Sequence, residues 1–117
     1  GMYHEKLLIW RETMNLVVAV YEATQRFPRM ELYGLGQQLR RAAISIISNI
    51  AEGSGRASGI DRRHFFVMAR GSLREAEAQV AVAARLGYIA APEEQALHAL
   101  CDHVGRLLSG LIRTATP

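Results

Sequence analysis

Apolar residues recur at alternating steps of three and four along four successive segments of the chain, and this rhythm constrains the fold most. The clearest case is one stripe formed by Phe66, Ala69, Leu73, Ala76, Val80 and Ala83. Steps of this size place side chains on one face of an α-helix, whereas a half-buried strand alternates at every second residue. We therefore predict helices over residues 7–26, 31–53, 60–86 and 92–112.

Each of the other three predicted helices carries an apolar stripe of its own. In the first helix we expect the core to receive Trp10, Met14, Val17 and Tyr21. In the second it receives Leu35, Leu39, Ala42, Ala43, Ile46 and Ile50, and in the fourth Leu97, Leu100, Val104, Leu107 and Leu111. Because the connections are short and no strand pattern or repeat is visible, we predict a single all-α domain over residues 1–117. Its expected architecture is an antiparallel up-down-up-down four-helix bundle.

Glycine, proline and serine mark the connections between these helices. Phe27 precedes Pro28, and proline disfavours helical geometry in the residue before it. The glycine- and serine-rich run 53–59 combines a glycine C-cap with a serine that can N-cap the next helix. Gly71 stands inside the third predicted helix. We expect another helix to cross closely there, and a ligand site is the alternative.

The first two predicted helices are more apolar than one core face requires. Beside the core stripe of the second helix lies a further line of residues, Arg40, Ile44, Ile47 and Ala51. All of them except Arg40 are apolar. In the first helix, the apolar sector is widened by Leu16, Val18, Ala19 and Val20. This surplus predicts a second partner surface, and therefore self-assembly into a homo-oligomer.

The sequence carries no signal that would direct it to a membrane or out of the cell. Its apolar runs fall far short of the ~20 residues that a membrane-spanning helix needs. The N-terminus lacks a secretory-signal pattern, and the single cysteine, Cys101, has no partner for an intramolecular disulfide. We expect a cytoplasmic protein without a membrane partner.

Positive charge is concentrated in the middle of the chain. The net charge is +3, but residues 40–74 hold seven arginines against two acidic residues. Because a guanidinium suits phosphates and carboxylates, a phosphate-bearing partner is one interpretation of this charge. The candidate nucleic-acid-binding residues are then Arg40, Arg41, Arg56, Arg62, Arg63, Arg70 and Arg74. The other interpretation is a solvated surface whose arginines pair with neighbouring glutamates.

A cluster of potential metal ligands on the fourth predicted helix lacks the spacing of a metal site. It consists of His98, Cys101, Asp102 and His103. The two histidines are five residues apart, so they point about 140° away from each other. The helical zinc motif instead needs histidines at i and i+4. We predict no metal and no cofactor here.

A second polar cluster, on the second predicted helix, lacks the base that a nucleophile needs. Its members are Ser45, Ser48, Asn49 and Glu52. No histidine shares their face, and a serine attacks only with a neighbouring base. We expect these side chains to form a polar layer with Arg70 and Ser72, and Glu52 to pair with Arg41 or with an arginine of the third helix. The protein is therefore not expected to be an enzyme.

Several stretches, spread over nearly the whole chain, resemble those of one known family. They are Trp10 to Tyr21 with Phe27-Pro28, Tyr33-Gly34-Leu35, Gln38 to Ile46, Ser48 to Gly53, Ala69 to Glu75, and Leu86-Gly87-Tyr88. The family comprises four-helix-bundle proteins encoded within intervening sequences of bacterial large-subunit ribosomal RNA genes. It includes the accessory variability determinant proteins of diversity-generating retroelements.

The resemblance implies assembly and binding without catalysis. Similar members form barrel-like homopentamers, and the retroelement branch binds nucleic acid and contacts a reverse transcriptase. For this chain the resemblance implies a homopentamer, with RNA or DNA and a reverse transcriptase as candidate partners. A protein-interaction scaffold without a nucleic-acid partner is the alternative. Where the family pattern has a proline, this chain has Ile47, so we expect any kink there to be lost or softened.

Overall fold

The computed structural model describes residues 2–115, which form four long helices joined by short connections. The helices are α1 (Met2–Thr24), α2 (Leu35–Ser54), α3 (Gly59–Arg85) and α4 (Ala91–Thr114), with a single 3-10 turn, η1 (Arg29–Glu31), before α2. Residues 2–115 contain no strand. None of the helices in this range is long and apolar enough to cross a membrane. The all-α prediction is confirmed.

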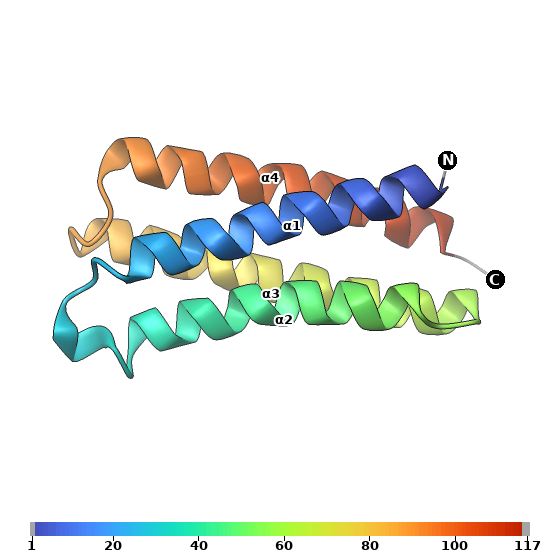
Figure 1. Cartoon of the computed structure of the whole chain (residues 1–117), viewed down its shortest axis with the longest axis horizontal. Helices are drawn as coiled ribbons and strands as arrows, with labels where there is room; N and C mark the ends of the chain where they lie inside the picture. The colour runs from blue at the N-terminus through green and yellow to red at the C-terminus, as the bar shows by residue number, and fades with distance from the viewer. Residues whose placement is uncertain (1, 116–117) are drawn as a thin grey trace.

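The helices run alternately in opposite directions and lie side by side (Figure 1). Each packs against its neighbours in the sequence, and α1 closes the ring by packing against α4. The most extensive contact joins α2 to α3. The result is a rod of 45 × 25 × 17 Å, which is the antiparallel up-down-up-down bundle that the sequence predicts.

The core faces of α2 and α3 agree with the sequence prediction. All six residues of the predicted α3 stripe are buried. In α2 five of the six predicted residues are buried, and Leu35 is half-buried against the same core. In α4 the prediction holds for Leu97, Val104 and Leu111, while Leu100 and Leu107 lie at the margin of the core. The interior positions beside them belong to Cys101 and Leu108.

The predicted core face of α1 is wrong. The side that packs on the bundle carries Ile9, Thr13, Leu16, Val20 and Ala23. Of the predicted stripe only Val17 is buried; Trp10, Met14 and Tyr21 remain 44%, 39% and 37% exposed. The predicted stripe and the buried stripe both repeat at steps of three and four. Thr13 makes the buried stripe less apolar in sequence than the predicted one. The choice between them depends on packing that α1 alone does not specify.

The turns use the capping residues that the sequence supplies. The hydroxyl of Ser58 accepts a hydrogen bond from the Asp61 amide at 3.0 Å, as expected of an N-cap. Gly55 caps the C-terminus of α2. Gly87, with φ of 82°, follows the C-cap of α3 in the left-handed conformation that suits glycine. α2 runs through the buried Ile47 without a break, in keeping with the absence of proline.

The glycine that permits a close helix approach is Gly53 and not Gly71. A Cβ at Gly53 would lie 2.8 Å from the Phe66 ring carbon Cε1. A Cβ at Gly71 would meet nothing within 4 Å in the described chain, so the expected crossing helix is not there. The prediction for Gly71 is therefore wrong within the protomer.

Candidate nucleic-acid interface

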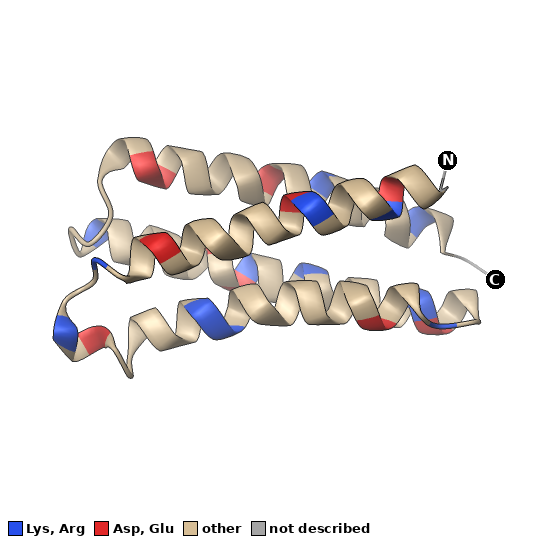
Figure 2. Ribbon diagram, in the orientation of Figure 1, with Lys and Arg blue, Asp and Glu red and all other residues tan. Residues whose placement is uncertain are grey.

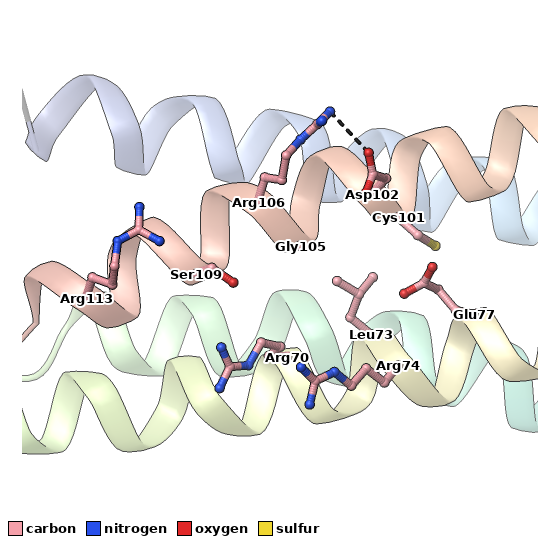
Figure 3. A pocket seen from close by; sticks show the side chains of 10 residues that line it. All are labelled: Arg70, Leu73, Arg74, Glu77, Cys101, Asp102, Gly105, Arg106, Ser109 and Arg113. Carbon is pink, nitrogen blue, oxygen red and sulfur yellow. Dashed lines mark ion pairs between the residues drawn. The ribbon is translucent and has the colours of Figure 1, made fainter.

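A groove of about 470 Å³ lies between the middle of α3 and the C-terminal half of α4 (Figure 3). Arg70 and Arg74 line it from α3, and Arg106 and Arg113 line it from α4. On each helix the two arginines share one face, because their spacings of four and seven residues correspond to about one and two helical turns. Antiparallel packing thus brings four arginines to one groove, which we call the arginine groove. In Figure 3 the guanidiniums of Arg70 and Arg74 lie along α3, and those of Arg106 and Arg113 are directed away from it.

Three of these four arginines have no ion-pair partner in the part of the chain that the structure describes. Arg106 is paired within its own helix, with Nη2 3.2 Å from Oδ2 of Asp102. Arg74 and Arg113 are exposed and Arg70 is half-buried. Guanidiniums that lack an internal carboxylate remain free to bind phosphate or carboxylate oxygens from outside.

The floor of the arginine groove is apolar and tightly packed. Leu73 lies between Arg70 and Arg74 in the sequence and is only 2% exposed. Gly105 faces it from α4, and a Cβ there would come within 3.3 Å of Leu73 Cδ2. The small residue lets α4 approach α3 closely while the arginines of both helices stand at the rim.

One end of the groove carries negative rather than positive charge. Glu77 is half-buried, and its carboxylate forms no hydrogen bond or ion pair within residues 2–115. Its neighbour across the groove is the buried Cys101 (Figure 3). Burial, with a smaller contribution from the Glu77 charge, raises the pKa of the Cys101 thiol to about 12. The thiol therefore stays protonated and is a poor nucleophile at neutral pH.

Three of the seven predicted arginines are held by neighbours in the fold instead. Arg40 Nε donates to Thr24 Oγ1 at 2.7 Å, and its guanidinium covers the Tyr21 ring at 4.9 Å. Arg56 lies 4.8 Å from the centre of the Phe65 ring. Arg62 donates to the backbone oxygens of residues 57 and 56, at 2.9 and 3.3 Å. These contacts stabilise the bundle and the α2–α3 turn.

The remaining four predicted arginines divide between the groove and separate surfaces. Arg41 and Arg63 are exposed, but they lie outside the arginine groove. Of the seven, only Arg70 and Arg74 line the arginine groove, whereas Arg40 and Arg41 line a separate hollow. The sequence interpretation missed Arg106 and Arg113, although their seven-residue spacing on one face of an antiparallel neighbour was a usable signal.

The expected polar layer between α2 and α3 is present in part. The hydroxyls of Ser45 and Ser72 are 2.8 Å apart, and Asn49 Nδ2 donates to the Ser45 carbonyl at 2.9 Å. The prediction for Glu52 is wrong: its carboxylate pairs with Arg56 at 3.2 Å. Arg56 follows Glu52 by four residues, at the start of the α2–α3 turn, and is close enough to pair with it. This local partner takes the place of Arg41 or an arginine of α3.

The two histidines of α4, His98 and His103, lie close to carboxylates and do not form a site with Cys101. His98 Nε2 lies 3.2 Å from Glu94 Oε2, and His103 Nδ1 lies 3.8 Å from Glu12 Oε1 on α1. Across the described residues, no three His, Cys, Asp or Glu side chains gather as a metal-binding group. Each imidazole instead faces a carboxylate at the surface.

A long apolar surface runs along the outside of α1. It consists of Tyr3, Leu7, Trp10, Met14, Val18 and Tyr21, all at least 37% exposed, and we call it the outer face of α1. Next to Tyr21, a hollow of about 490 Å³ is lined by Tyr33 and Ile44 among others. Figure 2 shows an uncharged stretch in the middle of α2. An apolar surplus is thus present, but three of its expected members, Leu16, Val20 and Ile47, are buried in the core instead.

Comparison with known proteins identifies a family and finds the same fold among solved structures. A family model described as 23S rRNA-intervening sequence protein matches residues 5–110. A crystal structure of a protein with unknown function from the S23 ribosomal protein family of Bacteroides thetaiotaomicron VPI-5482 superposes with a TM-score of 0.87. It is 18% identical, and the match covers 94% of this chain and 99% of that one, so the likeness shows the fold. No curated protein matches the sequence.

Proposed function

Because this chain belongs to the 23S rRNA-intervening sequence protein family, we propose that it is a non-enzymatic, self-assembling bundle that binds RNA or DNA. The observation that carries the proposal is the arginine groove. Arg70, Arg74 and Arg113 stand there on rigid helices without an ion-pair partner in residues 2–115. A groove with this chemistry suits phosphate groups.

Binding of this kind uses the phosphate backbone and therefore depends on salt. Each guanidinium donates hydrogen bonds to phosphate oxygens and displaces a condensed counterion, so affinity falls as the salt concentration rises. No aromatic side chain of the described residues lines the arginine groove, so bases have no ring to stack on there. The arginines supply the affinity.

Self-assembly is the second part of the proposal, and the outer face of α1 supports it. Single exposed apolar residues are ordinary on a protein surface, but a continuous face of this length marks a contact site. We assign this face to a second copy of the chain. The family resemblance suggests five copies, and five protomers of charge +3 carry about +15. Several arginine grooves then act on one nucleic-acid strand together.

A protein-interaction scaffold without nucleic acid is the second candidate. The hollow beside Tyr21 favours it. Aromatic, aliphatic and arginine side chains line it together, and this mixture is typical of protein–protein contacts. In that case the arginines of the groove contact acidic protein surfaces. The expected reverse-transcriptase partner stays a prediction under either function.

Salt-dependent binding of fluorescently labelled RNA and DNA tests the proposal. We expect binding at low salt that weakens steeply as salt is added. The variant Arg70→Gln/Arg74→Gln/Arg113→Gln should lower the slope of log affinity against log salt by about 2 on single strands. Circular dichroism should show unchanged helicity, because these side chains make no ion pair inside the described chain.

A variant with the same loss of charge elsewhere is the matched control. Arg11, Arg29 and Arg85 are exposed and lie outside the arginine groove. Arg11→Gln/Arg29→Gln/Arg85→Gln should keep most of the wild-type slope. No binding of any nucleic acid at low salt overturns the proposal, and equal effects of the two triple variants remove the groove as the binding site.

A further inference from the structure

We propose that the arginine groove holds one guanine nucleotide of a single strand, with its phosphate against Arg70 and Arg74 and its base against Glu77. The inference rests on the proposed nucleic-acid binding. It adds that the nucleic acid is single-stranded and that guanine is the preferred base. Neither follows from positive charge alone.

The dimensions of the groove suit a mononucleotide unit. Its volume of about 470 Å³ falls in the range of about 300–1,000 Å³ that is typical of small-ligand sites. A duplex keeps its bases paired and stacked, so it would offer such a groove only backbone phosphates. A single strand can place an unstacked base in it.

The groove has opposite charges at its two ends, arranged along one helix. Arg70, Arg74 and Glu77 share a face of α3, and Arg70 and Glu77 are separated by about 10 Å along the helix axis. Figure 3 shows the Arg70 and Arg74 guanidiniums directed along the groove and the Glu77 carboxylate directed toward α4 near Cys101. This order matches a nucleotide, whose phosphate and base lie at opposite ends.

The chemistry of Glu77 selects among the bases. An ionised carboxylate only accepts hydrogen bonds, and the groove's other carboxylate, Asp102, is already paired with Arg106. The Watson–Crick edge of guanine presents two adjacent donors, N1–H and the N2 amino group, to the two oxygens of a carboxylate. Adenine and cytosine place an acceptor nitrogen beside their amino group, and uracil places its single N–H between two carbonyls.

Fluorescence anisotropy at low salt tests this assignment with three labelled probes. They are a uridine strand of about 12 nucleotides, the same strand with isolated guanosines, and a duplex of equal length. We expect the guanosine-containing strand to bind about ten-fold more tightly than the uridine strand, the size of one bidentate base contact. The duplex should bind more weakly than either strand.

Glu77→Gln should abolish the preference for guanosine while leaving binding of the uridine strand intact or slightly stronger. The amide offers one acceptor where the carboxylate has two. Glu75→Gln is the matched control, because Glu75 is exposed and lies outside the groove. It removes the same charge from the same helix and should keep the preference.

The outcomes separate this inference from the proposed function. Equal binding of the two single strands, or a preference that survives Glu77→Gln, overturns the assignment of guanine to Glu77. Duplex binding as tight as single-strand binding overturns the single-strand site. In either case nucleic-acid binding itself stands, whereas absence of all binding at low salt overturns both.

Discussion

At the scale of single residues, two helical glycines of this bundle have different structural roles. Gly53 is buried in α2 and faces Phe65 and Phe66 of α3. Gly71 is exposed in the middle of α3 with free space around its Cα. In the isolated protomer the first glycine is required by packing, whereas the second only weakens its helix.

Alanine at each glycine should therefore change stability in opposite directions. Gly53→Ala should lower the free energy of unfolding by about 1–3 kcal/mol, because its methyl group overpacks the contact with Phe66. Gly71→Ala should raise it by about 0.5–1 kcal/mol through helix propensity. Urea unfolding measures both. Destabilisation by Gly71→Ala would instead reveal a close contact at that position, for example from another copy of the chain.

Cys101 predicts how stability responds to alkaline pH. Its pKa rises from 9.0 to about 12 on burial, so between these values the unfolded chain has released the thiol proton while the folded chain retains it. Folding stability therefore falls as pH rises through this window. The free energy of unfolding should fall more steeply between about pH 9 and 10.5 in the wild type than in Cys101→Ala. Identical slopes would mean that the thiol is not buried.

At the scale of the helices, the sequence is sufficient wherever a helix has one apolar stripe. α3 is the clear example: Arg63, Val67 and Arg74 on the neighbouring face are exposed, and all six predicted core residues are buried. α1 carries two stripes with the same spacing, one on each side. Periodicity identifies both but does not say which one meets α2 and α4. The error at Trp10 and Met14 follows from that symmetry.

The candidate site was predicted only in part, for a related reason. A charge count along the sequence found Arg70 and Arg74, but it did not reveal that α4 lies beside them. Arg106 and Arg113 join the groove through tertiary packing, which a count within one segment does not contain. Conversely, the charge count included Arg56 and Arg62 as binding residues. In the structure both arginines instead form contacts at the α2–α3 turn, with Glu52 and with a backbone oxygen.

At the scale of the whole molecule, the two surfaces of interest lie on different helices. The outer face of α1 belongs to one helix, and the arginine groove lies between α3 and α4. The proposed contact between copies through α1 would therefore use residues other than those that line the groove. In the proposed function, assembly would multiply the charge that a nucleic acid meets, so self-association is the claim on which that proposal depends most.

Light scattering coupled to size-exclusion chromatography tests this claim by measuring the mass in solution. The protomer mass is 13.0 kDa; we expect a multiple of it at micromolar concentration, about 65 kDa for five copies. Trp10→Lys/Met14→Lys should shift the mass to that of the protomer while helicity is kept. Val82→Lys/Leu86→Lys, which alters similarly exposed residues at the end of α3, should not. A stable, helical wild-type species of 13.0 kDa would contradict the account.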